Sequence, residues 1–334
     1  MADSTLDASV RTIRASHPRR VAVLGVGAMG QRHVRVVRGL PEHFALAGVF
    51  DANRTVAEDV ACAWDVTRFD EERACIMAAD LVVIASPIEA HADTARHALE
   101  EGRHVLVEKP LCSRSADAYA LVKAAARGSV RLFVGHSERF NPVVRALRGL
   151  VVPEDVRAIS IRRVTPTLGR THEHGVLLSL GVHDVDLAAY LTGGPVELRN
   201  VSGVRRAGDE DQAELTVVAK TGATVRIRAD RLAPRRERTI HLLTPTEEFV
   251  GDLLEPRLFR RPRRGGQATE VALSVAEPLV AQAQAVSLEL DGESSAGAAT
   301  GADGARALAI VVSAVEALRD GGDLASSRRV SEAS

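Results

Sequence analysis

The chain has 334 residues, 46% of them hydrophobic and 26% charged, which is typical of a soluble protein with room for two domains. Its formal net charge of −1 creates no overall basic field, so we expect neither nucleic acid nor a membrane as a partner. The three cysteines lack metal-ligand spacing, no apolar run approaches the ~18 residues of a membrane span, and the amino terminus does not resemble a signal peptide, so we expect a cytoplasmic protein without a metal site.

The first half of the chain alternates strand-like and helix-like segments after residues 1–18, which we expect to form a disordered tail. Short apolar runs predict strands at residues 21–24, 44–50, 81–85, 104–107 and 131–134. The segments between them predict helices at residues 29–40, 56–64, 90–101 and 115–126. This alternation predicts a doubly wound parallel sheet with right-handed crossovers, that is, a Rossmann domain over residues 19–138.

The second half has a different pattern, which we assign to a domain over residues 139–320 followed by a polar tail at 321–334. We expect a short helix after Pro142, a strand at 158–164, a loop at 165–174, an apolar helix at 176–191, loops at 257–266 and 291–304, and a helix at 305–319. Strand signals run from residue 196 to about 249, and Lys220-Thr221-Gly222 predicts a hairpin between 211–218 and 224–229. The fold class is therefore α/β, with a second α+β domain whose largely antiparallel sheet has helices over one face.

The glycine fingerprint Gly25-Val26-Gly27-Ala28-Met29-Gly30 follows the first strand and opens the first helix, as in dinucleotide-binding sites. Gly25 allows the tight turn, Gly27 lets the backbone approach the pyrophosphate, and Gly30 allows close packing of helix and strand. Asp51 ends the second strand, where its carboxylate would accept hydrogen bonds from ribose hydroxyls and repel a 2′-phosphate. We therefore expect NAD rather than NADP, a preference that nearby Arg54 could weaken. A glycine-rich turn that binds nothing is the alternative.

The tripeptide Glu108-Lys109-Pro110 ends the strand at 104–107, at the edge of the parallel sheet where ligands bind. An ammonium group held there can hydrogen-bond to a substrate hydroxyl and favour the loss of the hydroxyl proton. Together with the glycine fingerprint, this lysine predicts redox chemistry on an alcohol. The alternative is a surface lysine that happens to end a strand.

Several segments occur in the order seen in the Gfo/Idh/MocA oxidoreductases. They are Ala85-Ser86-Pro87 with His91, then Glu108-Lys109-Pro110, then residues 135–142 (GHSERFNP), then residues 181–186 (GVHDVD). The chain resembles this family from Arg20 to about Arg319. Within the family, residues 162–166, 175–187 and 209–213 are most similar to the bacterial UDP-N-acetylglucosamine 3-dehydrogenase group.

The resemblance implies that Lys109 holds the substrate hydroxyl and that His183 transfers its proton, with a Lys109–Pro110 bond that is often cis in the family. Elementary chemistry agrees, because a histidine with an unperturbed pKa of ~6.5 suits a general base and a nearby cation stabilises the developing alkoxide. A buried structural histidine is the alternative for His183, since the surrounding helix is strongly apolar.

The resemblance also implies the residues that surround this pair. We expect the cofactor to be contacted, besides the fingerprint and Asp51, by Ser86, Pro87, His91 and Glu108. We expect the substrate to be contacted, besides Lys109 and His183, by Arg139, Asn141, Arg163 and Ser179. Structural roles are the alternative for His136, Arg139 and Asn141, which lie at the expected domain junction.

Ser179 departs from the family pattern, in which an aspartate usually stands four residues before the histidine. Positions four apart share one face of a helix, so Ser179 and His183 should project together. A serine can hydrogen-bond to substrate, but it cannot supply the negative charge that raises the basicity of the histidine and orients its ring. We expect altered or lower activity, by ~1–3 kcal/mol if one charged hydrogen bond is lost.

These observations lead to one hypothesis and two rivals. We expect an NAD-dependent dehydrogenase, acting as a dimer or tetramer, that oxidises a ring hydroxyl of a sugar or nucleotide sugar, with carbon 3 of a UDP-amino sugar as the leading case. The rivals are another sugar or inositol dehydrogenase of the family and an NAD-binding sensor without turnover. Two weaker features remain open: His172-Glu173-His174 as a metal site or a substrate loop, and the basic stretches 231–238 and 257–264 as solvated faces or a diphosphate site.

Overall fold

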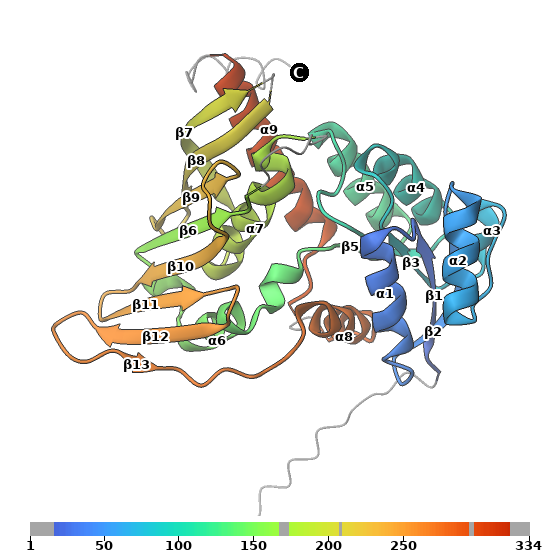
Figure 1. The fold of residues 1–334 in the computed structure, drawn as a ribbon, viewed down its shortest axis with the longest axis horizontal. Coiled ribbons are helices and arrows are strands. Elements are labelled where there is room, and N and C mark those ends of the chain that lie inside the picture. The colour runs from blue at the N-terminus through green and yellow to red at the C-terminus, as the bar shows by residue number, and fades with distance from the viewer. Residues whose placement is uncertain (1–16, 167–173, 207–208, 294–296, 321–334) are drawn as a thin grey trace, which may run out of the picture.

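The computed structural model describes residues 17–166, 174–206, 209–293 and 297–320, which form two units built around separate sheets (Figure 1). Of the tails predicted at 1–18 and 321–334, residues 1–16 and 321–334 lie outside these ranges. No helix within the described ranges is both long enough and apolar enough to cross a membrane.

The first unit is a five-stranded parallel sheet with the order β2-β1-β3-β4-β5. Its elements are β1 (Arg19–Leu24), α1 (Ala28–Arg38), β2 (Phe44–Phe50), α2 (Arg54–Trp64), α3 (Glu72–Met77), β3 (Leu81–Ile84), α4 (Ile88–Glu100), β4 (His104–Val107), α5 (Ser115–Arg127) and β5 (Leu132–Val134). The predicted Rossmann topology is confirmed. The short helix α3 was not predicted, because six residues are too few to show a helical period.

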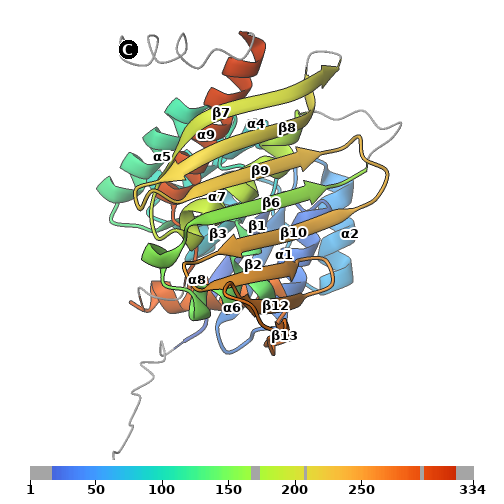
Figure 2. The ribbon, with the colours of Figure 1, turned by 90° about the vertical axis from the view of Figure 1, so that its left-hand side faces the viewer.

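The second unit contains an eight-stranded sheet with the order β13-β12-β11-β10-β6-β9-β8-β7. Its strands are β6 (Ala158–Val164), β7 (Val196–Arg206), β8 (Asp209–Ala219), β9 (Thr224–Asp230), β10 (Glu237–Leu243), β11 (Glu247–Asp252), β12 (Arg257–Pro262) and β13 (Thr269–Glu270). Only β6 and β9 pair in parallel, so the prediction of a largely antiparallel sheet is confirmed. Figure 2 shows the strands side by side, with the helices behind them.

The helical segments of the second half begin with η1 (Ser137–Phe140), α6 (Pro142–Leu150) and η2 (Pro153–Asp155). They continue with a π-helical turn, η3 (Leu177–Gly181), which leads into α7 (Val182–Leu191), and end with α8 (Pro278–Leu290) and α9 (Gly301–Arg319). Helices α7 and α9 pack against the sheet through an apolar cluster that includes Val185, Leu187, Leu215, Ile227 and Val311. The π-turn and α7 together occupy the segment predicted as one apolar helix at 176–191.

Two expected loops proved to be partly regular. Residues 257–262 form β12, the strand next to the edge of the sheet. Leu258 is completely buried, whereas the arginines of β12 are exposed. These arginines led us to expect a loop here. In the expected loop at 291–304, α9 already begins at Gly301. Its start is fixed by a capping box in which the Thr300 side chain accepts from the Asp303 amide and the Asp303 carboxylate accepts from the Thr300 amide.

The helix α8, which was not predicted, returns to the first unit rather than extending the second. Leu279, Ala285 and Val286 of α8 share a hydrophobic core with Val21 and Val23 of β1. Figure 1 shows α8 beside α1, far along the chain from it. The range 139–320 expected for the second domain therefore contains a helix that completes the core of the first.

A buried ion pair ties the segment between the two sheets to α7. The Arg139 guanidinium in η1 donates from Nε and Nη2 to the two carboxylate oxygens of Asp186, at 2.7 Å and 2.5 Å. Both side chains are almost completely buried, and Asp303 of α9 lies 3.5 Å from Arg139 Nη1. The segment that links the two units is thus held to both α7 and α9.

We expect Asp186→Ala to lower the free energy of unfolding by about 3–5 kcal/mol, because it leaves a buried guanidinium without its main partner. The pair between Arg68 and the exposed Asp70 offers a matched control, and Asp70→Ala should leave the free energy of unfolding nearly unchanged. Urea denaturation followed by circular dichroism measures both. Equal midpoints for the two variants would contradict a stabilising role for the buried pair.

Candidate active site

The glycine fingerprint forms the turn between β1 and α1 at the carboxyl edge of the parallel sheet. Gly25 has φ +82°, and a Cβ there would lie 2.3 Å from the backbone nitrogen of Ser86. A Cβ on Gly30 would lie 1.9 Å from the Gly25 oxygen, whereas one on Gly27 would meet no atom within 4 Å. The backbone is therefore open at Gly27, where a pyrophosphate must approach. The first turn of α1 carries neither a side-chain cap nor an acidic residue, so its amides remain free for phosphate.

Asp51, directly after β2, is held against this turn. One carboxylate oxygen accepts from the Val26 amide and the other from the Asn53 amide, both at 2.8 Å. Each oxygen retains lone-pair capacity for the hydroxyls of an adenosine ribose. Arg54 points to Asp70, 3.7 Å away, rather than to Asp51. These residues fit NAD, with the glycine turn for its pyrophosphate and Asp51 for its ribose.

His91 braces the loops that follow β3 and β4. Its Nδ1 lies 2.9 Å from the Pro110 oxygen and its Nε2 lies 2.8 Å from the Ser86 oxygen, with the ring almost fully buried. Burial lowers the pKa of this histidine, which favours the neutral ring, and a neutral ring can donate to only one of the two carbonyls. Pro87 lies between these contacts and precedes α4. The two contacts hold the loops after β3 and β4 together, beside the turn at Gly25.

Glu108 has an unpredicted partner in His33 of α1. His33 Nε2 lies 2.7 Å from Glu108 Oε1, and both residues are buried. Burial alone would raise the pKa of Glu108, but the hydrogen bond from His33 and the charge of Lys109 hold it below its ordinary value. A Cβ on Gly135 would lie 2.8 Å from Glu108 Oε2, so a side chain there would displace the carboxylate. No local motif marks this contact, because the two residues are 75 positions apart.

Lys109 extends from the end of β4 to the segment before α7. Its bond to Pro110 is cis, and its Nζ donates to the backbone oxygen of Ser179 at 2.9 Å. Burial lowers the pKa of Lys109 from its ordinary value of 10.5, and the positive charges of Arg163 and Arg238 act in the same direction. The lysine therefore reaches the helical segment that carries His183.

His183 lies in the first turn of α7. Burial holds its pKa well below 6.5, and the positive charge of Lys109 lowers it further. Its Nδ1 is buried without a hydrogen-bond partner among the described residues, and its ring packs edge-on against His136 at 5.7 Å between centroids. His183 is consequently a neutral imidazole beside an ammonium group, the state that a general base requires.

Ser179 lies within the π-turn, and among the described residues its side chain forms no hydrogen bond with His183. Its hydroxyl donates to the Gly175 oxygen at 2.9 Å and accepts from Nη2 of Arg231 at 2.5 Å. The prediction that Ser179 and His183 share one face assumed a regular α-helix. In the π-turn, hydrogen bonds join residues five apart rather than four apart, so this spacing no longer applies. Arg231, which directly follows β9, was noted from the sequence only as part of a basic stretch.

Three residues expected to bind substrate are engaged inside the protein instead. Arg163, 1% exposed, forms a bidentate pair with Asp184. Asn141 caps α6 by accepting from the Val143 amide and donates to the Leu253 oxygen. Arg139 is held by Asp186 as described above. Their contacts favour structural roles, because the polar group of each is bonded to partners within the protein.

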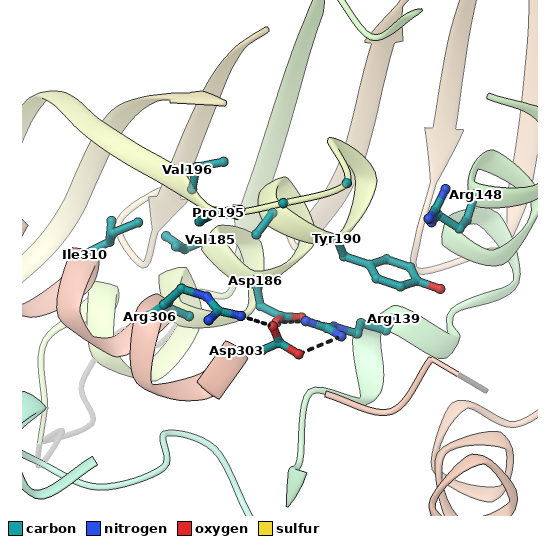
Figure 3. A pocket seen from close by; sticks show the side chains of 14 residues that line it. Arg139, Arg148, Val185, Asp186, Tyr190, Pro195, Val196, Asp303, Arg306 and Ile310 are labelled. Carbon is teal, nitrogen blue, oxygen red and sulfur yellow. Dashed lines mark hydrogen bonds and ion pairs between the residues drawn. The ribbon is translucent and has the colours of Figure 1, made fainter. Parts of the chain in front are cut away.

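The cavity drawn in Figure 3, about 310 Å³ in volume, is separate from this constellation. Arg139, Asp186, Tyr190 and Asp303 line it, together with residues of the loop after α7, whereas Lys109 and His183 do not. Of the suggested metal ligands, His172 and Glu173 lie outside the described residues, and the remainder of the described chain contains no group of three ligands able to hold a metal.

Comparison with known proteins agrees with this geometry. Residues 19–136 match an oxidoreductase family with an NAD-binding Rossmann fold, and residues 116–252 match the Gfo/Idh/MocA carboxyl-terminal domain. UDP-N-acetylglucosamine 3-dehydrogenase of Acidithiobacillus ferrooxidans is 29% identical over 250 residues, which is 74% of this chain and 78% of the relative. The NAD-dependent scyllo-inositol 2-dehydrogenase of Bacillus subtilis is 29% identical over 238 residues, which is 65% of this chain and 69% of the relative.

Solved structures show the same fold over nearly the whole chain. The structure of the Acidithiobacillus ferrooxidans enzyme superposes with a TM-score of 0.83 at 27% identity, covering 90% of this chain and 97% of that one. The WlbA dehydrogenase from Bordetella pertussis, in complex with NADH and UDP-GlcNAcA, has a TM-score of 0.74 at 21% identity and shares the fold over 91% of this chain and 98% of that one. The chain therefore belongs to the Gfo/Idh/MocA family of NAD-binding oxidoreductases.

Proposed function

We propose that this protein is an NAD-dependent dehydrogenase that oxidises a ring hydroxyl of a sugar or nucleotide sugar to a ketone. The observation that carries the proposal is the contact between Lys109 Nζ and the backbone of Ser179, four residues before His183. It brings a cation and a neutral imidazole together at the sheet edge where the glycine turn would hold NAD. Such a pair suits removal of a proton from an alcohol.

The division of roles follows from the charges of the two groups. Lys109, as an ammonium ion, would hold the alcohol oxygen and stabilise the negative charge that develops there. His183, whose pKa is lowered by burial, would accept the hydroxyl proton. NAD, when bound, supplies the acceptor for the hydride of the alcohol carbon. Burial strengthens each of these interactions, because less water is present to screen them.

The relatives support a sugar as the substrate. One is named a UDP-N-acetylglucosamine 3-dehydrogenase and another a scyllo-inositol 2-dehydrogenase, so polyhydroxylated rings are common to both. We propose carbon 3 of a UDP-linked amino sugar as the first position to test. We also propose that the protein assembles as a homo-oligomer through the large sheet of its second unit.

A cofactor-binding sensor without turnover is the second candidate. It is favoured by Ser179, whose hydroxyl bonds to Arg231 and Gly175 and offers no negative charge to His183. The unpartnered Nδ1 of His183 agrees with this weaker orientation of the ring. Turnover measurements decide between the two candidates.

We expect Lys109→Ala to lower kcat/KM by about 100- to 1,000-fold on any sugar that the protein oxidises, because one group that stabilises the developing alkoxide is lost. Absorbance of NADH at saturating NAD measures the rate. Lys123→Ala, which removes an exposed lysine on α5, is the matched control and should retain full activity. Identical rates for the wild type and Lys109→Ala on every sugar would overturn the assignment.

Both limbs of the pH profile of kcat/KM should lie at lower pH than the ordinary pKa values of histidine and lysine would give. Because burial holds the pKa of His183 well below 6.5, its basic form persists below that pH and the acid limb should fall below pH 6.5. Because the pKa of Lys109 is lowered from 10.5, the alkaline limb should also fall below pH 10.5. His183→Gln should abolish the acid limb while retaining NAD binding. An acid limb at or above pH 6.5 in the wild type would contradict the neutral histidine.

A further inference from the structure

Arg231 is a buried arginine whose acceptors within the described ranges are neutral oxygens. Its residue is 6% exposed, and its Nη2 lies 2.9 Å from the His174 oxygen, 3.4 Å from the Gly175 oxygen and 2.5 Å from the Ser179 hydroxyl oxygen. Among the described residues, none forms an ion pair with this guanidinium. A buried cation normally requires a negative partner to offset its lost hydration.

The neighbouring carboxylates do not meet this requirement by direct contact. Glu210 and Asp211 are close enough to favour the charged form of Arg231, but burial still lowers its pKa below the ordinary value. Glu210 is itself committed to the start of the helical segment, where its Oε1 accepts from the Leu177 amide at 3.0 Å. Arg163 and Arg238 differ from Arg231, since both donate to the Glu138 carboxylate.

A second cation meets Arg231 at Ser179. Lys109 Nζ donates to the Ser179 backbone oxygen while Arg231 donates to the Ser179 hydroxyl, so the two cations bracket one small residue. The first amide of this helical segment, at Leu177, is already bonded to Glu210 and adds no free positive end. Arg231 therefore contacts the same residue as the lysine that we propose to hold the substrate hydroxyl.

We propose that Arg231 is a specificity-determining residue that binds a negatively charged group of the sugar substrate, a carboxylate or a phosphate, while Lys109 holds the reacting hydroxyl. This inference rests on the proposed function and narrows its substrate class to anionic sugars. Ser179 has a defined part in it, because a small neutral side chain leaves Arg231 available. An aspartate at position 179 would neutralise the guanidinium from within the protein.

The test compares charged and uncharged sugars across matched variants. The substrates are UDP-N-acetylglucosamine, its 6-carboxylate analogue, glucose 6-phosphate and free N-acetylglucosamine, each with saturating NAD. We expect Arg231→Gln to lower kcat/KM by about 10- to 100-fold for the preferred anionic sugar and by less than about 2-fold for the uncharged one, as loss of a charged hydrogen bond predicts. Arg226→Gln, an exposed change on β9, is the control and should leave all rates unchanged.

Ser179→Asp provides a second variant that does not depend on tolerance of a change at Arg231. It should lower kcat/KM for the anionic sugar as Arg231→Gln does, and by a clearly smaller factor for the uncharged sugar. The sugar that responds identifies the anion, since the uronate carries a carboxylate on the ring, glucose 6-phosphate a monophosphate and UDP-N-acetylglucosamine only the diphosphate. Equal losses on charged and uncharged sugars in both variants would overturn the proposal.

The outcome for Arg231 can be separated from the outcome for the proposed function. If the wild type oxidises none of the sugars, the proposed dehydrogenase activity on them fails. Calorimetric titration of the NAD-saturated protein with the same anionic sugars then tests the site alone. Binding that Arg231→Gln weakens by about 10-fold or more supports the anion site, and binding that is absent or unaffected by the variant refutes it.

Discussion

The hydrogen bond from Lys109 Nζ to the backbone oxygen of Ser179 is the contact on which the site depends. Lys109 belongs to the edge of the parallel sheet, whereas Ser179 belongs to the helical segment of the second unit. Lys109 comes from the first unit and His183 from the second, so this pair forms only where the two units meet. The buried pair of Arg139 and Asp186 supports this arrangement, because it fixes α7 to the segment that follows β5. Structural ion pairs and reactive groups therefore share the same junction.

Burial sets the charge state of this junction. Removing water from His183 makes its protonated form costly, and the nearby ammonium of Lys109 raises that cost further. The same burial would be prohibitive for several arginines without compensation. Arg163 is compensated by Asp184 and Glu138, which satisfy its guanidinium at close range. The result is a region where most positive charges are balanced and the histidine is kept neutral.

The sequence allowed prediction of those features that depend on neighbouring residues. Apolar runs and the glycine fingerprint were sufficient for the Rossmann sheet, and the family motifs were sufficient to select Lys109 and His183 as the pair that the fold brings together. Features that depend on distant contacts were not predictable in this way. His33 acquires meaning only when α1 packs beside Glu108, and α8 is recognisable as part of the first unit only when its apolar residues meet β1. The strand β12 was hidden by its arginines, since charge on an exposed strand face resembles that of a loop.

The serine at position 179 changes meaning once its neighbours are known. From the sequence it is a missing negative charge, and the expected consequence is a weaker base. In the structure, Ser179 is bonded to two cations, Lys109 and Arg231. The absence of a carboxylate at position 179 therefore affects the net charge around these cations as well as the orientation of His183. Glu210 and Asp211 favour the charged form of Arg231, but within the described residues neither forms a direct ion pair with it, and this is where our proposal places the anion of a ligand. Under this proposal, the absence of a carboxylate at position 179 has two consequences: His183 loses a partner that would orient it, and Arg231 is left without an internal aspartate and can bind a charged ligand.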